Sequence, residues 1–165
     1  MVEAAISPVE TLPEVMAAPH PVAQLRSRVL ITGATGMLGS DLVPVLAGAG
    51  CDVFPRAESE LDITREDEVA RAFREVRPDI LVNCAAFTKV DAAETDPRAF
   101  QVNAEAVHLL AESCIRHSCR LVQISTDFVF DGEKREPYLE EDPKAPLSEY
   151  GRTKALGEDE ALRLP

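Results

Sequence analysis

The sequence has few basic residues for its length. Lysine and arginine together number 17 among 165 residues, against 29 aspartate and glutamate residues, and the formal net charge is −12. A surface with this excess of negative charge repels phosphate backbones and anionic lipids. We therefore expect neither a nucleic acid nor a membrane as a partner. A single nucleotide held in a cleft by local dipoles is still compatible with this charge.

Metal-ligand and disulfide patterns are also missing. Cys51, Cys84, Cys114 and Cys119 form no Cys-x-x-Cys pair, and the three histidines show no ligand spacing. Such spacings mark zinc sites and the disulfide frameworks of small secreted domains. The sequence therefore predicts no metal ion and four reduced thiols in a cytoplasmic protein.

No apolar run in the sequence is long enough to span a bilayer. Residues 1–27 are rich in proline, lack glycine and have no basic segment before an apolar one, so they do not resemble a secretory signal. We expect residues 1–27 to be a disordered leader and residues 28–165 to form one domain.

Strand-like and helix-like patterns alternate through that domain. We expect strands at 28–32, 52–54, 60–63, 80–86 and 120–125, and helices near 38–49, 64–77, 96–114 and from 148 onward. Thr64 and Asp67 have the spacing of a capping box, and Asp96-Pro97 that of a capped helix start. This alternation predicts a Rossmann-type α/β fold, a doubly wound parallel sheet with helices on both faces.

A glycine-rich loop joins the first strand to the first helix. Gly33, Gly36 and Gly39 have the spacing Gly-x-x-Gly-x-x-Gly. In this context the first glycine permits a tight turn, the second lets a pyrophosphate approach the backbone, and the third lets the helix pack closely. The free N–H groups at the start of the helix favour an anion. The loop therefore predicts a site for NAD or NADP.

The end of the second strand bears on which cofactor binds. An acid there hydrogen-bonds the adenosine ribose of NAD, whereas an arginine accommodates the 2′-phosphate of NADP. Pro55 stands where an acid would be needed, and Arg56 follows it. This pair favours NADPH over NADH, with a plain surface arginine as the alternative interpretation of Arg56.

Tyr150 and Lys154 are four residues apart near the start of the last predicted helix, so they share one face. A lysine ammonium favours the phenolate form of a nearby tyrosine, which suits the tyrosine to proton transfer. Thr126, after the 120–125 strand, offers a hydroxyl for a substrate carbonyl. The three residues predict a carbonyl-reducing site.

The motifs together resemble the extended short-chain dehydrogenase/reductase superfamily from Arg28 to the end of the chain. They are Ile31-Thr-Gly33-Ala-Thr-Gly36-Met-Leu-Gly39, Leu61-Asp62-Ile63, Asn83-Cys-Ala-Ala86, Ser125-Thr-Asp127 and Tyr150-Gly-Arg-Thr-Lys154. The stretches Ser125–Gly132, Pro137-Tyr138 and Ala145-Pro-Leu147 are similar, more narrowly, to the dTDP-4-dehydrorhamnose reductase family. The resemblance implies reduction of the 4-keto group of dTDP-6-deoxy-L-lyxo-4-hexulose to dTDP-L-rhamnose.

The same resemblance implies three sets of site residues. The catalytic residues are Thr126, Tyr150 and Lys154. The cofactor-binding residues are Gly33, Thr35, Gly36, Met37, Leu38, Gly39, Arg56, Asp62, Ile63, Ala85, Ala86, Thr88, Asn103, Tyr150 and Lys154. The residues around the nucleotide-sugar are Val90, Thr126, Asp127, Phe128 and Tyr150. Phe128 stands where a tyrosine is frequent in the family, so one substrate hydrogen bond is in doubt.

Three alternatives bear on this interpretation. A sugar-nucleotide 4,6-dehydratase would need Asp-Glu after the threonine, but Asp127 is followed by Phe128, so reduction is favoured. A dinucleotide-binding regulatory subunit, similar to that of methionine adenosyltransferase, would also keep Tyr-x-x-x-Lys. The family continues past the position of Pro165 with further strands and a substrate region, so an inactive fragment is the third alternative. A homodimer is also left open by the sequence.

Overall fold

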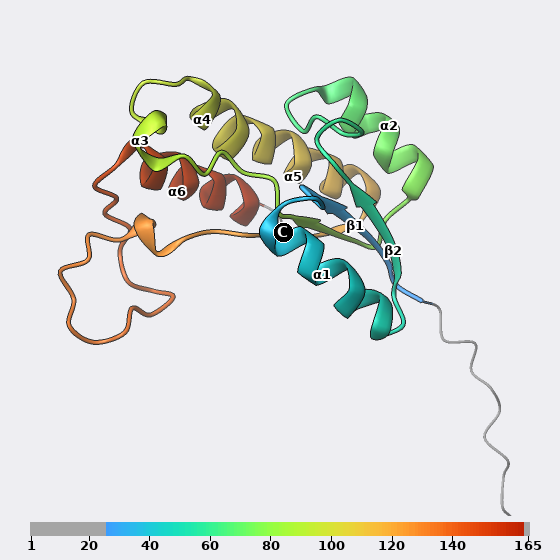
Figure 1. The fold of residues 1–165 in the computed structure, drawn as a ribbon, viewed down its shortest axis with the longest axis horizontal. Helices are drawn as coiled ribbons and strands as arrows, with labels where there is room; N and C mark the ends of the chain where they lie inside the picture. Colours follow the sequence, from blue (N-terminus) through green and yellow to red (C-terminus); the bar gives the residue numbers. More distant parts are fainter. Residues whose placement is uncertain (1–25, 164–165) are drawn as a thin grey trace, which may run out of the picture.

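The computed structural model describes residues 26–163, which form a four-stranded parallel sheet flanked by helices (Figure 1). The strands are β1 (Arg28–Thr32), β2 (Asp52–Arg56), β3 (Ile80–Asn83) and β4 (Arg120–Gln123), in the order β2-β1-β3-β4. Val29 pairs with Val53 on one side and with Ile80 on the other. The expected leader, apart from its last two residues, lies outside the described residues.

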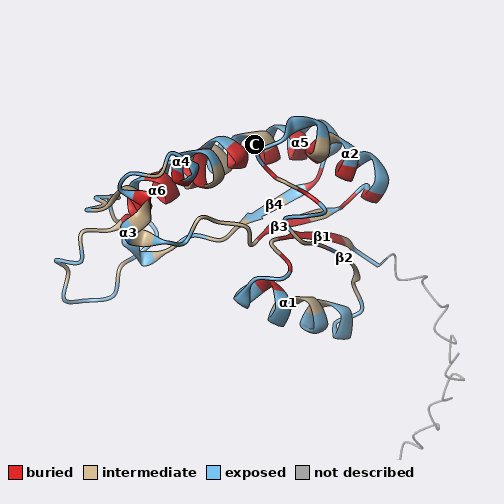
Figure 2. Ribbon diagram, turned by 45° about the horizontal axis from the view of Figure 1, so that its top comes forward, coloured by how far each residue is buried: buried red, intermediate tan, exposed pale blue. Residues whose placement is uncertain are grey.

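Helices cover both faces of this sheet. Helix α1 (Met37–Gly48) lies on one face, and α2 (Glu66–Val76), α5 (Ala106–His117) and α6 (Glu149–Leu162) lie on the other side (Figure 2). Leu30 of β1 belongs to a core cluster with Phe73 of α2, whereas Ile31 packs with Val82 and α1. Because successive side chains of a strand point to opposite faces, β1 is buried on both. The predicted doubly wound Rossmann architecture is confirmed.

One long helical segment follows β3 and carries an irregular turn. It consists of α4 (Arg98–Phe100), a π-helical turn η1 (Gln101–Glu105) and α5. Its predicted start at Asp96-Pro97 is confirmed, because Oδ1 of Asp96 accepts a hydrogen bond from the Arg98 N–H at 3.0 Å. The π turn has no signature in the sequence. Such turns are frequent at functional sites.

The predicted strand at 60–63 is wrong. The segment is a turn, in which the Leu61 N–H donates to the Ala57 carbonyl at 3.0 Å. Leu61 and Ile63 are each 4% exposed, so their alternation reflects burial under α2 rather than sheet pairing. The sheet therefore lacks the extra strand that the pattern suggested.

The predicted capping box at the start of α2 is also wrong. The helix begins at Glu66, and its N-cap residue Arg65 makes no side-chain capping bond. Thr64 instead donates its N–H and its hydroxyl to Oδ1 of Asp62, at 2.9 and 2.7 Å. Asp67 pairs with Arg65 at 3.3 Å. Thr64 is therefore hydrogen-bonded to Asp62 and does not cap α2.

Two short helices and two strand ends differ from the expectation. Helix α3 (Val90–Ala93) and a 3₁₀ turn, η2 (Asp127–Val129), occupy segments where none was predicted. Strands β3 and β4 end at Asn83 and Gln123, before the predicted ends. Within residues 26–163, no helix has the length and apolar character that crossing a membrane requires.

Candidate active site

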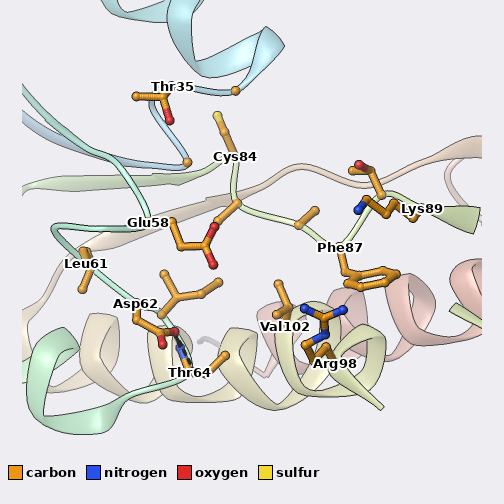
Figure 3. A pocket seen from close by; sticks show the side chains of 16 residues that line it. Thr35, Glu58, Leu61, Asp62, Thr64, Cys84, Phe87, Lys89, Arg98 and Val102 are labelled. Carbon is orange, nitrogen blue, oxygen red and sulfur yellow. Dashed lines mark hydrogen bonds between the residues drawn. The ribbon is translucent and has the colours of Figure 1, made fainter. Parts of the chain in front are cut away.

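A cavity of about 420 Å³ opens beside the carboxyl ends of the strands (Figure 3). Ligands of open parallel sheets bind at this edge, where the strand order reverses. Loops that follow β1, β2 and β3 supply most of its wall. The lining residues are Gly33, Thr35, Gly36, Glu58, Leu61, Asp62, Ile63, Thr64, Cys84, Ala85, Ala86, Phe87, Thr88, Lys89, Arg98 and Val102.

Two of the three glycines in the loop are required by the fold itself. Gly33 has a φ of +62°, and a Cβ there would lie 2.6 Å from the Ala85 nitrogen. A Cβ at Gly39 would overlap the Gly33 carbonyl and Ala34. These positions give the tight turn and the close packing of α1 that the spacing predicts.

Gly36 has a different role. A Cβ there would meet the Gly33 oxygen at 3.2 Å, a tight contact but not an excluded one. Gly36 is the N-cap of α1 and supplies no side chain for the first N–H groups of that helix. Those groups are the usual donors to a phosphate. A bare backbone at the start of a helix, on the wall of the cavity, fits the pyrophosphate of a dinucleotide.

The segment after β3 is held from behind by Asn103. Oδ1 of Asn103 accepts from the Phe87 N–H at 2.9 Å, and Nδ2 donates to the Phe87 carbonyl at 3.0 Å. Nδ2 also lies 3.2 Å from Oγ1 of Thr153 on α6. Asn103 is 2% exposed and does not line the cavity. The cofactor contact of Asn103 stays a prediction, and in this structure the side chain holds the backbone of Phe87, which lines the cavity.

Polar side chains also tie the strand ends together. Asn83 accepts a hydrogen bond from the Thr32 hydroxyl at 2.5 Å and donates to Oε1 of Gln123 at 2.8 Å. Thr32 and Asn83 are fully buried. No prediction from the sequence included a role for Thr32 or Gln123. A polar residue at the end of each of three adjacent strands was the available signal.

Helix α6 brings Tyr150 and Lys154 to the end of β4. Its N-cap is Ser148, whose hydroxyl accepts from the Gly151 N–H at 3.1 Å. Lys154 is 3% exposed, and its Nζ donates to the Ile124 carbonyl at 2.5 Å. Burial lowers the pKa of Lys154 from its ordinary value, and the nearby carboxylate of Glu158 opposes that shift.

Tyr150 lies between aromatic and apolar side chains. Its ring meets the Phe128 ring edge-on, with centroids 5.5 Å apart. Tyr150 shares a core cluster with Ala93 and Ala99, against which Phe87 and Val90 pack. Phe87 also lines the cavity. The segment from 84 to 90 therefore connects the glycine-loop cavity to the surroundings of Tyr150.

The glycine in Tyr-Gly-x-x-Lys has a steric reason. A Cβ at Gly151 would overlap the Phe128 carbonyl, and one at Gly157 would overlap the Asn103 carbonyl. Glycines on one helix thus let α6 approach both η2 and the π turn. No prediction from the sequence included a packing role for these two glycines, although two glycines spaced within one helix are a signal of close packing.

Thr126 caps the turn η2. Its Oγ1 accepts from the Phe128 N–H at 3.3 Å and donates to Oδ1 of Asp127 at 3.2 Å. Phe128 contacts the Tyr150 ring, and Val90 packs against the core cluster of Tyr150. Thr126 and Asp127 directly precede Phe128, so all four predicted substrate residues lie at the Tyr150 end of the site. To polarise a substrate carbonyl, the Thr126 hydroxyl would turn its proton away from Asp127.

The remaining predicted cofactor residues fall into two groups. Gly33, Thr35, Gly36, Asp62, Ile63, Ala85, Ala86 and Thr88 line the cavity. Met37, Leu38, Gly39 and Arg56 do not. Nη1 of Arg56 donates to its neighbour's carbonyl, that of Pro55, at 3.0 Å. Glu58, which the sequence analysis left out, lines the cavity near the end of β2.

Neither a metal cluster nor a disulfide contributes to this site. No three His, Cys, Asp or Glu side chains in the described part of the chain gather as metal ligands. All four cysteines are free thiols. Cys84 faces the cavity, and burial raises the pKa of its thiol.

Residues 27–163 match the sequence profile of a protein family described as "RmlD substrate binding domain". The chain belongs to this family. The match takes in the whole sheet, the glycine loop and the helix of Tyr150 and Lys154.

Individual relatives agree with that assignment. A Streptomyces antibioticus protein named "Probable dTDP-4,6-dihydroxy-2-methyloxan-3-one 4-ketoreductase" is 53% identical over 82% of this chain and 46% of its own length. A dTDP-4-dehydrorhamnose reductase of Burkholderia thailandensis is 46% identical over 79% of this chain and 44% of its own length. The chain thus spans about half the length of the curated relatives it matches.

A solved structure shows the same fold. The dTDP-4-dehydrorhamnose reductase of Bacillus anthracis, determined in complex with NADP, superimposes with a TM-score of 0.81 at 39% identity. The similarity covers 85% of this chain and 50% of that one.

Proposed function

We propose that this chain is the dinucleotide-binding part of an NADPH-dependent reductase, which reduces the 4-keto group of a dTDP-6-deoxyhexulose. The substrate inferred from the sequence is dTDP-6-deoxy-L-lyxo-4-hexulose, and the product is dTDP-L-rhamnose. One observation carries the proposal: α6 holds Tyr150 and the buried Lys154 beside a wall shared with the glycine-loop cavity. The names of two relatives, a probable dTDP-4,6-dihydroxy-2-methyloxan-3-one 4-ketoreductase and a dTDP-4-dehydrorhamnose reductase, support the substrate class.

The residues present suit a dinucleotide. Gly33 and Gly36 leave the backbone bare where the pyrophosphate would approach, and the start of α1 faces it. Ile63 and Ala85 offer apolar surface for the adenine. When bound, NADPH supplies the hydride that reduces the carbonyl carbon. NADP in the Bacillus anthracis structure supports this choice of cofactor.

Tyr150 then supplies the proton. Its phenol donates to the carbonyl oxygen as negative charge develops there, which is general acid catalysis. The Lys154 ammonium favours the phenolate that remains, and its bond to the Ile124 carbonyl keeps it in place. Thr126 hydrogen-bonds the same oxygen and orients the sugar. The Phe128 ring packs edge-on against the Tyr150 ring.

Four free thiols support a cytoplasmic site of action. The direct test of the reaction is NADPH oxidation in the presence of dTDP-6-deoxy-L-lyxo-4-hexulose, by the chain as it stands and by the chain extended to the length of its relatives. The extended chain should oxidise NADPH only when the 4-keto sugar is present. Oxidation that ignores the sugar, or none in the extended chain, would refute the proposed reaction.

A further inference from the structure

A carboxylate outside the lining of the glycine-loop cavity reaches from α6 to the end of β4. Glu158 lies one helical turn after Lys154, and its Oε1 accepts a hydrogen bond from the Ser125 hydroxyl. Ser125 stands between Ile124, whose carbonyl accepts from Lys154 Nζ at 2.5 Å, and Thr126. Two hydrogen bonds therefore join α6 to these three consecutive residues.

The same three residues connect the sheet to a turn. The Ile124 N–H donates to the Asn83 carbonyl at 3.3 Å, which continues the pairing of β4 with β3. Thr126 is already the N-cap of η2. Ser125 thus lies between the sheet and the turn, at an exposed position. A hydrogen bond from its hydroxyl to α6 fixes where this connection lies relative to the helix.

Lys144, from the loop before α6, holds the other oxygen of the carboxylate. Its Nζ lies 3.4 Å from Oε2 of Glu158, and it also donates to Oδ1 of Asp159 at 2.5 Å and to the Ala155 carbonyl at 3.2 Å. The Glu158 side chain is 25% exposed. With Ser125 on one oxygen and Lys144 on the other, the partly buried carboxylate keeps one orientation, and charge-assisted bonds of this type are strong.

This arrangement links the positions of two residues of the site. Lys154 is bonded to the Ile124 carbonyl, so its ammonium moves when residue 124 moves. Thr126 directly follows Ser125, so the direction of its hydroxyl depends on the same backbone. Loss of the bond between Ser125 and Glu158 would release both from their places beside α6.

We propose that Glu158 is a positioning residue of the site, which holds residues 124–126 against α6 so that Lys154 and Thr126 keep their places. This inference rests on the proposed function, because it assumes that Lys154 serves the bound cofactor and Thr126 the sugar. Glu158 itself touches neither ligand and acts through Ser125.

The test measures NADPH affinity in variants of the full 165-residue chain. Dissociation constants are read from nicotinamide fluorescence, which meets no tryptophan background in this chain. Glu158→Ala removes the acceptor for Ser125, whereas Glu158→Gln keeps an oxygen in its place without the charge. Ser125→Ala removes the same bond from an exposed position, so it carries the test if circular dichroism shows that Glu158→Ala does not fold. Asp159→Ala is the matched control, because it removes a carboxylate that Lys144 binds and that Ser125 does not.

Glu158→Ala and Ser125→Ala should each weaken NADPH binding about tenfold, the loss of one hydrogen bond to a charged group. The double variant should also lose about tenfold rather than about a hundredfold, because both changes remove the same bond. Glu158→Gln should stay within about threefold of the parent, and Asp159→Ala within about twofold.

A purely structural role of Glu158 is separated by repeating the change in a Lys154→Met chain. If Glu158 acts by placing Lys154, Glu158→Ala should alter the NADPH affinity of that chain by less than about twofold. A general loosening of α6 would weaken binding equally with or without the lysine.

Three results overturn the role of Glu158 and leave the proposed function intact. They are a Glu158→Ala or Ser125→Ala chain that binds NADPH as Asp159→Ala does, a Glu158→Gln chain as weak as Glu158→Ala, and an undiminished effect of Glu158→Ala in Lys154→Met. Failure of the parent chain to bind NADPH is a separate outcome, which overturns the proposed function itself.

Discussion

Replacement of Asn103 by alanine should loosen the wall of the site and the helix behind it. The change removes three hydrogen bonds: two to the Phe87 backbone, at 2.9 and 3.0 Å, and one to Thr153, at 3.2 Å. A polar group left unpaired in the interior costs about 1–3 kcal/mol. Thr153 keeps its bond to the Tyr150 carbonyl, at 2.9 Å, so its loss is small.

The Phe87 N–H and carbonyl are partly buried. The cost of leaving each of them unpaired should therefore lie near the lower end of the range for interior groups. We expect Asn103→Ala to lower the free energy of unfolding by about 2–4 kcal/mol. A domain of ordinary stability stays folded after that loss. The freed segment at 84–88 should bind the cofactor less well, so the affinity for NADPH should fall about tenfold or more.

Two further variants sharpen this test. Asn103→Asp keeps the acceptor for the Phe87 N–H but loses both donors and sets a carboxylate against the Phe87 carbonyl. That repulsion raises the pKa of the new carboxyl above its unfolded value. The destabilisation should therefore be largest at neutral pH and should shrink as the pH falls and the group is protonated. Gln101→Ala, an exposed position of the same π turn, is the control.

Urea unfolding followed by circular dichroism gives the stability, and nicotinamide fluorescence gives the NADPH affinity. If Asn103→Ala matches Gln101→Ala in both measurements, the hydrogen bonds of Asn103 do not hold the cofactor wall, and the reasoning is refuted.

Three further predictions concern the glycine loop and the lysine. Gly36→Val should abolish dinucleotide binding in a folded chain, because its side chain occupies the path of the pyrophosphate; calorimetric titration that found retained affinity would remove the loop from the site. Gly33→Ala should instead impair folding, because φ is +62° and its Cβ would lie 2.6 Å from the Ala85 nitrogen; a melting temperature equal to that of the parent would contradict this. Lys154→Met should weaken NADPH binding. In the parent chain, affinity should fall as the pH rises through the lowered pKa of Lys154, below the ordinary value of 10.5, and a titration series should show no such fall in Lys154→Met.

Strong local patterns explain how much of the fold was predictable. The apolar run of β1, the glycines of the loop and the capped start at Asp96 each specify one structure with short-range chemistry. The strand expected at 60–63 failed because alternating apolar residues report burial, and a turn beneath a helix buries them as well as a sheet does. Nothing local marks the π turn, whose residue Asn103 contacts Thr153 and Gly157 of α6.

The local structure around Gly36, Tyr150 and Lys154 was predictable, because each lies in a motif that specifies its own turn or helix. Contacts between residues that are far apart in the sequence were less predictable. The bonds of Asn103 to Phe87 and Thr153 span 16 and 50 positions. Glu58 lines the cavity and the predicted Arg56 does not. This outcome depends on the conformation of the turn after β2, which the spacing of residues in the sequence does not specify.

The central claim is that Tyr150 delivers the proton during reduction of a 4-keto sugar nucleotide. Its most direct test is the rate of NADPH oxidation by Tyr150→Phe and by the parent, both in a chain extended to the length of its relatives, with dTDP-6-deoxy-L-lyxo-4-hexulose as substrate. Loss of a general acid predicts a rate about 10²–10⁴-fold lower, with the affinity for NADPH unchanged. A Tyr150→Phe variant that reduces the sugar at the parent rate would contradict the claim.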